Sequence, residues 1–281
     1  MAYCETASIN FLRRDPLYAT EKPFQVFTGD DIATQGQRNT NLLWEERNVQ
    51  VEDFRDEGDY FDIDNHGFTS RTIEGFSRLD STTEIELSYI PTIQDLIRNE
   101  IADAGTVFVY DWRIRDSSTY YPEGRVNFGD QSKSLLPSNF AHVGKSHGTG
   151  VHCETHSAKF YKEFKQSNSP VDQWALAVCD ANTFESSELM ETDSVRGGNV
   201  TTLYYAHYNP NQKWHFLHQQ TPKEALIFKH FDSKTVVKSS RAIHASIQHQ
   251  KVVPDAKPRR SIEVKVLVFA GSFESSIQES G

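Results

Sequence analysis

Short runs of apolar residues, each bounded by turn-forming residues, recur along most of the 281-residue chain. Runs of this length, rich in β-branched and aromatic residues, predict strands rather than helices. The expected strands cover residues 8–12, 24–27, 48–51, 106–110, 174–178, 200–205, 214–217, 224–228 and 262–269. Turn sequences such as Gly197-Gly198-Asn199 and Asn209-Pro210-Asn211 separate several of them.

One stretch follows a helical spacing instead. Apolar residues recur at intervals of three and four over 93–101, after Pro91-Thr92, and Gly105 is expected to end the helix. Many short strands with one or two early helices predict a mainly β fold, a double-stranded β-helix (jelly roll) with a few flanking helices.

The expected organisation is a single domain over 1–281. We assign 1–146 to an N-terminal elaboration and lid loop, 147–271 to a metal-binding jelly-roll core and 272–281 to a frayed tail. The polar stretch 116–146 is expected to be a long loop, in which His142 is solvated or related to the lid.

Composition and charge limit the partners and the cellular compartment that we expect for this protein. The net charge of −10 argues against a nucleic-acid partner, which normally requires a basic patch. No apolar run approaches the roughly 20 residues of a membrane span. Three widely spaced cysteines predict no disulfide framework, and the N-terminus has no signal-peptide pattern, so we expect a cytoplasmic protein.

The first candidate for chemistry is the stretch Gly150-Val151-His152-Cys153-Glu154. Residues i and i+2 of a strand project from the same face, so His152 and Glu154 can reach one metal ion together. Two histidines and one carboxylate on one face of a metal form the facial triad of non-haem Fe(II) oxygenases. His156 lies on the same strand face and is an alternative to Glu154.

The third ligand should be a histidine of a later strand. The candidates are His207, His215, His218, His230, His244 and His249. His244 is favoured because Arg259 and Ser261 follow it at the start of the strongest predicted strand. A guanidinium can bind a carboxylate with two parallel hydrogen bonds, and a hydroxyl can add one more. Simpler interpretations make His244 a hydrogen-bonded core histidine and Arg259 a surface cation paired with Glu263.

Several sequence blocks carry a resemblance to a known family. They include His152-Cys153-Glu154, Tyr208-Asn209-Pro210, 228–233, Ile243-His244-Ala245 and 258–264. Together they resemble fungal Fe(II)/2-oxoglutarate-dependent dioxygenases related to gibberellin desaturase-like, cephalosporin methoxylation and meroterpenoid endoperoxide synthase proteins. The chain departs from that family at Glu154, where the family usually has Asp, and at Lys165, where it tends to have Arg.

The resemblance implies an oxygenase that uses Fe(II), 2-oxoglutarate and O2 on a small molecule derived from a terpenoid, polyketide or peptide. Hydroxylation, desaturation, rearrangement and endoperoxidation all stay open as outcomes. The implied ligands are His152, Glu154 and His244 for iron and Arg259 and Ser261 for 2-oxoglutarate. Residues expected near the substrate are Tyr205, Trp214, Arg115 and Lys165.

Two other functions stay open on the same scaffold. The chain could be a redox-neutral isomerase or pericyclase, which the departures at Glu154 and Lys165 would suit, or a non-catalytic partner subunit. A homodimer is the oligomeric state considered.

Overall fold

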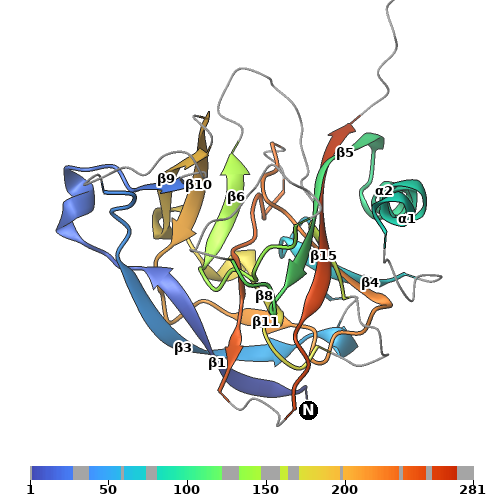
Figure 1. The fold of residues 1–281 in the computed structure, drawn as a ribbon, viewed down its shortest axis with the longest axis horizontal. Coiled ribbons are helices and arrows are strands. Elements are labelled where there is room, and N and C mark those ends of the chain that lie inside the picture. The colour runs from blue at the N-terminus through green and yellow to red at the C-terminus, as the bar shows by residue number, and fades with distance from the viewer. Residues whose placement is uncertain are drawn as a thin grey trace, which may run out of the picture.

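The structure is a computed structural model that describes residues 2–27, 38–57, 60–73, 81–121, 133–146, 159–163, 171–196, 199–233, 237–250 and 255–270. Its described strands form two sheets (Figure 1). The larger has ten strands in the order β14-β1-β3-β11-β8-β13-β6-β10-β9-β2, and the smaller has five in the order β4-β12-β7-β15-β5.

The strands of the larger sheet are β1 (Cys4–Leu12), β2 (Phe24–Phe27), β3 (Trp44–Asp53), β6 (His142–Ser146), β8 (Leu176–Cys179), β9 (Leu189–Arg196), β10 (Asn199–Ala206), β11 (Trp214–Phe216), β13 (His244–Ser246) and β14 (Gln248–His249). Those of the smaller sheet are β4 (Phe68–Thr72), β5 (Ala104–Asp116), β7 (Lys159–Glu163), β12 (Glu224–Phe228) and β15 (Arg260–Ala270). The prediction of a mainly β fold is confirmed.

Both sheets combine early and late parts of the chain. β1 pairs with β14, and β5 pairs along its length with β15. The second pairing places Ser261, near the start of β15, opposite Arg115 of β5. Each of these strand pairs therefore joins segments that are far apart in sequence.

The helical segment differs from its expected boundaries. It begins earlier, at α1 (Thr82–Glu84), because Ser81 caps it by accepting a hydrogen bond from the Glu84 amide at 3.1 Å. It continues through a π-helical segment, Ile85–Tyr89, into α2 (Ile90–Glu100). The expectation that Gly105 ends the helix is wrong: the turn is made by Asp103 in the left-handed region (φ 64°), and β5 already starts at Ala104.

Hydrophobic clusters pack beneath these elements, and two of them bear on the site. Ile93 and Ile97 of α2 are fully buried in one cluster with Val264 and Val266 of β15, and α2 lies beside β5 of the smaller sheet (Figure 1). A second cluster inside the larger sheet includes Phe11, Trp214 and Phe216, all almost fully buried. Among the described helices, none is both long and apolar enough to cross a membrane.

The stretch 116–146 is not a loop throughout. Its last five residues form β6, which pairs with β10 and β13. The sequence His142-Val143-Gly144-Lys145-Ser146 has only one apolar side chain, Val143, which is fully buried. Because apolar and polar residues hardly alternate in this strand, it depends on pairing with its neighbours for stability. For the same reason, the sequence pattern does not predict a strand here.

Candidate metal and co-substrate site

A pocket opens where β6, β8 and β13 of the larger sheet meet the ends of β5 and β15. Its lining residues are Arg115, Pro137, Ser138, His142, Leu176, His244, Ser246 and Arg259. Three of the residues singled out from the sequence, His244, Arg259 and Arg115, thus come together in one pocket.

His244 lies at the start of β13 and is 1% exposed. Its Nδ1 lies 3.1 Å from the carbonyl oxygen of Ala242. A carbonyl only accepts, so Nδ1 carries the proton and donates, which leaves Nε2 of a neutral ring with its lone pair. This is the arrangement in which a histidine binds a metal while its other nitrogen holds the ring in place.

His142 repeats this arrangement on the neighbouring strand. It pairs directly with His244 in the sheet, and the two ring centroids are 4.3 Å apart. Its Nδ1 donates to the Phe140 carbonyl oxygen at 2.6 Å, so its Nε2 is also left with its lone pair. The expectation of a solvated His142 in a loop is wrong, because β6 carries this half-buried side chain into the pocket.

Arg259 also lines the pocket and is 2% exposed. Its Nε donates to Ser261 Oγ at 3.1 Å and its NH1 to Ser246 Oγ at 3.1 Å. The same NH1 donates to the carbonyl oxygen of Trp174, a residue in the left-handed region with φ of 56°. The interpretation of Arg259 as a surface cation is therefore wrong, and Arg259 and Ser261 are in direct contact.

Arg115 brings a second guanidinium to the pocket. Its Nε and NH2 donate to Glu263 Oε2 at 3.0 and 2.8 Å, and its NH1 donates to the Leu136 carbonyl oxygen at 3.1 Å. Glu263, which the simpler interpretation assigned to Arg259, instead pairs with Arg115 and lies fully buried. Arg115 is therefore half of a buried ion pair, whereas the hydrogen bonds from Arg259 to Ser261, Ser246 and Trp174 go to neutral oxygens.

Of the other expected pocket residues, Trp214 lies elsewhere, Lys165 is outside the described residues, and Tyr205 lies next to the pocket residue His142, with ring centroids 6.3 Å apart. Trp214 is 1% exposed within the core of the larger sheet, packed edge-on against Phe11. Tyr205 is buried beside Trp44, its hydroxyl donates to Gln25 Oε1 at 3.2 Å, and burial raises its pKa to about 12. His152, Glu154, His156 and Lys165 fall outside the described residues.

The remaining histidines considered as third ligands have other surroundings. His207 Nδ1 donates to the Leu12 carbonyl oxygen, His215 packs against Phe61, His218 stacks on Tyr3, and His249 pairs with Glu5. Only His230 shares the surroundings of His244, with ring centroids 5.1 Å apart. Within the described residues, no group of three or more His, Cys, Asp or Glu side chains is already arranged to hold a metal ion. The described residues contribute two neighbouring imidazoles to the pocket, those of His142 and His244.

Comparison with known proteins identifies the fold family. Residues 9–269 match a family described as "Oxidoreductase/YMDC permease-like domain". The chain belongs to this oxidoreductase family. The match covers both sheets and every residue that lines the pocket.

Relatives with assigned functions come from fungi. The chain is 27% identical over 249 residues to the Fe(II)/2-oxoglutarate-dependent dioxygenase nvfI of Aspergillus novofumigatus, covering 84% of this chain and 88% of the relative. It is 25% identical over 308 residues to the hydroxylase/desaturase CTB9 of Cercospora beticola, covering 94% and 90%. The resemblance to fungal Fe(II)/2-oxoglutarate-dependent dioxygenases is therefore confirmed.

The fold also agrees with a solved structure. The iron and alpha-ketoglutarate-dependent endoperoxidase NvfI superposes with a TM-score of 0.79 at 24% identity, over 95% of this chain and 98% of that one. The predicted jelly-roll fold is confirmed by this agreement.

Proposed function

We propose that the chain is an Fe(II)/2-oxoglutarate-dependent oxygenase that oxidises a C–H bond of a fungal specialised metabolite. The observation that carries the proposal is the pocket with His244 and His142 at one end and Arg259 at the other. Imidazole nitrogen is a good ligand for iron, and a guanidinium is a good partner for a carboxylate. The bound iron would supply oxidation by O2, coupled to decarboxylation of 2-oxoglutarate.

The residues at the iron end fit part of a facial site. The sequence pattern proposes His152 and Glu154 as companions of His244, whereas the described structure supports His142 as the nearest partner of His244. These are two alternative ligand sets that share His244. In either set the Nδ1–H···O bond to Ala242 holds the His244 ring so that Nε2 can bind.

The residues at the other end fit the far carboxylate of a 2-oxo diacid. Arg259 is positioned by Ser246 and Trp174, and Ser261 lies against its Nε. A guanidinium anchored in this way is preorganised, so little side-chain entropy is lost when an anion binds. We therefore propose Arg259 and Ser261 as the groups that bind 2-oxoglutarate.

The substrate would bind beside the co-substrate, where Arg115 lines the pocket. Because Arg115 is ion-paired with Glu263 and donates to the Leu136 carbonyl, its guanidinium is held in a fixed position. Tyr205 and Lys165 stay in the proposal as substrate-side residues. The proposal includes a small-molecule substrate, O2 and no nucleic acid, in a cytoplasmic single-domain protein over 1–281 that can form a homodimer.

An anaerobic titration tests the proposal. Fe(II) and 2-oxoglutarate are added together, and the weak visible charge-transfer band of the chelate is recorded. We expect a saturable band from the wild type and none from His244→Ala. Absence of the band from iron-loaded wild type would contradict the proposal and favour a redox-neutral function.

A further inference from the structure

A stretch of chain that joins the two sheets runs along the pocket. Residues 134–141, which we call the strap, directly precede β6 and contribute Pro137 and Ser138 to the pocket lining. Near its start, Leu135 makes a single parallel bridge to β5 of the smaller sheet. Near its end, Phe140 makes another to β1 of the larger sheet. The strap therefore spans from one sheet to the other beside the pocket.

Backbone hydrogen bonds hold the strap at both sheets. On the side of the smaller sheet, the Leu135 amide donates to the Ile114 carbonyl oxygen at 2.8 Å, and the Leu135 carbonyl accepts from the Asp116 amide at 2.9 Å. On the side of the larger sheet, the Asn139 carbonyl accepts from the Asn10 amide at 3.0 Å. The residues that line the pocket lie between these two anchored regions.

The strap is also tied to the residue that positions Arg259. The Ser246 amide donates to the Ser138 carbonyl oxygen at 2.7 Å. The hydroxyl of the same Ser246 accepts a hydrogen bond from the Arg259 guanidinium at 3.1 Å. Ser246 thus holds the strap beside the guanidinium that we propose to bind the far carboxylate of 2-oxoglutarate.

Arg115 ties the strap one residue before Pro137. Two nitrogens of its guanidinium donate to Glu263 Oε2 at 3.0 and 2.8 Å, and the third donates to the Leu136 carbonyl oxygen at 3.1 Å. Glu263 is fully buried, so this ion pair is fixed within the protein. All three guanidinium nitrogens of Arg115 donate to protein oxygens, which is the arrangement of a residue that positions its neighbours.

Pro137 lies between the two tied residues, Leu136 and Ser138. Its ring fixes the backbone angle φ, so this part of the strap is stiff. The wall that Pro137 forms can move away from the pocket only if the bond at Leu136 or the bond at Ser138 breaks.

We propose that the strap sets the length of the 2-oxo diacid that the pocket accepts, and that Arg115 with Glu263 is the positioning pair that holds it. The inference rests on the proposed function and specifies its co-substrate. One additional methylene group in a fitted pocket changes selectivity by about 10–200-fold. 2-Oxoglutarate should fit, whereas 2-oxoadipate, which is longer by one methylene, has room only if the strap moves.

The test compares these two acids. Each is titrated anaerobically with Fe(II), the chelate band is recorded, and the ratio of the two dissociation constants is taken. The wild type should favour 2-oxoglutarate by at least about tenfold. Arg115→Met combined with Glu263→Met removes both charges together, so no charge of this pair stays buried alone. In this double variant the ratio should fall by at least about fivefold. A general weakening of the site would affect both acids alike and leave the ratio unchanged.

A second variant loosens the strap without touching the ion pair. Pro137→Gly frees the backbone angle φ and should lower the ratio in the same direction. Near-ultraviolet circular dichroism verifies that each variant is folded.

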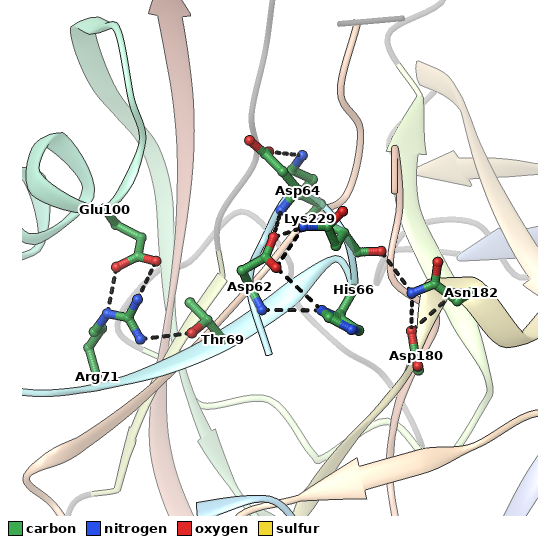
Figure 2. A network of polar contacts seen from close by, with 10 residues as sticks. Asp62, Asp64, His66, Thr69, Arg71, Glu100, Asp180, Asn182 and Lys229 are labelled. Carbon is green, nitrogen blue, oxygen red and sulfur yellow. Dashed lines mark hydrogen bonds and ion pairs between the residues drawn. The ribbon is translucent and has the colours of Figure 1, made fainter. Parts of the chain in front are cut away.

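The matched control is Arg71→Met combined with Glu100→Met (Figure 2). In this pair, too, two guanidinium nitrogens donate to the carboxylate, at 2.6 and 2.7 Å, and the third donates to a backbone carbonyl, that of Ser70, at 2.7 Å. Neither residue lines the pocket, so the control should keep the wild-type ratio.

The inference is overturned if the Arg115 and Glu263 double variant and Pro137→Gly both keep the wild-type ratio. It is also overturned if the wild type binds the two acids equally well. In both cases a chelate band with 2-oxoglutarate still supports the proposed function. If the wild type gives no band with either acid, the proposed function itself fails.

Discussion

At the scale of single residues, histidine and arginine side chains line one pocket. His244 and His142 each donate a hydrogen bond from Nδ1 to the carbonyl oxygen two residues earlier. In both neutral rings Nε2 therefore keeps the lone pair that a metal could bind. Arg259 is fixed by neutral oxygens of Ser261, Ser246 and Trp174. The pocket thus combines two imidazoles with a buried guanidinium, which supports the proposed binding of a metal and of an anion.

Arg259→Lys tests the anion end. Lysine keeps the charge but loses the planar fork, so the dissociation constant of 2-oxoglutarate should rise by about 10–100-fold, the equivalent of a charged hydrogen bond. The measurement is the anaerobic chelate titration. Arg260→Lys is the matched control, since Arg260 is 40% exposed and 3.9 Å from Asp116. A change of less than twofold in Arg259→Lys would contradict the assignment.

Burial of His215 makes stability depend on pH. Burial lowers the pKa of His215 below its usual value, in a cluster with Phe61 and Phe68. Between the unfolded-state pKa of about 6.5 and the lower folded-state value, the unfolded chain binds more protons, so stability falls as pH falls through this window. His207 is shifted in the same direction, also by burial.

The check is the urea midpoint at pH 7.5 and pH 5.5. The wild type should have the lower midpoint at pH 5.5, and His215→Phe should lose part of that difference. If the urea midpoint of His215→Phe falls between pH 7.5 and pH 5.5 by as much as that of the wild type, groups other than His215 cause the pH dependence.

Among the elements, the connection that carries Lys229 organises the site. It links β12 to the turn before β13, and the buried ammonium joins it to Asp64 in an early loop. Figure 2 shows this network beside the separate pair of Arg71 and Glu100. A loop from the first quarter of the chain thereby supports residues that line the pocket.

Lys229→Met should destabilise the fold by about 3–5 kcal/mol, because it leaves the fully buried Asp232 carboxylate without its cation. The free energy of unfolding is measured by urea titration. Lys22→Met is the control: Lys22 pairs with Glu191 and Asp193 while 48% exposed, so its loss should cost less than about 1 kcal/mol. Similar costs for the two variants would refute the role of the buried pair.

Sequence pattern predicted strands with dense apolar residues better than strands with few of them. β12 and β2 have their expected bounds, because each has dense apolar or aromatic residues between turns. β6 and β13 are short and polar at their ends, and they exist because each pairs with neighbours on both sides. His142 was missed for this reason, although a histidine two residues before a glycine was visible in the sequence.

At the scale of the whole molecule, the pocket depends on contacts between distant segments. Ser261 pairs with Arg115, and His142 pairs with His244, across more than 100 residues in each case. A spacing rule along the chain can connect His244 with Arg259, which are close in sequence. It cannot find partners that only sheet pairing brings together.

Binding should therefore stabilise the molecule as a unit. Fe(II) with 2-oxoglutarate at about 100 times the dissociation constant should add about 2.7 kcal/mol to the free energy of unfolding. Anaerobic calorimetry of the melting temperature measures the effect, and His244→Ala should show almost none. The same increase in His244→Ala would place the binding site elsewhere.

The most direct measurement is turnover of the co-substrate. Purified protein with Fe(II), 2-oxoglutarate and extracts of fungal metabolites is assayed by mass spectrometry for succinate and for oxidised product. The account predicts succinate that requires O2 and Fe(II), and that is lost in His244→Ala and strongly reduced in Arg259→Lys. Product formation that proceeds without O2 or without consumption of 2-oxoglutarate would contradict it.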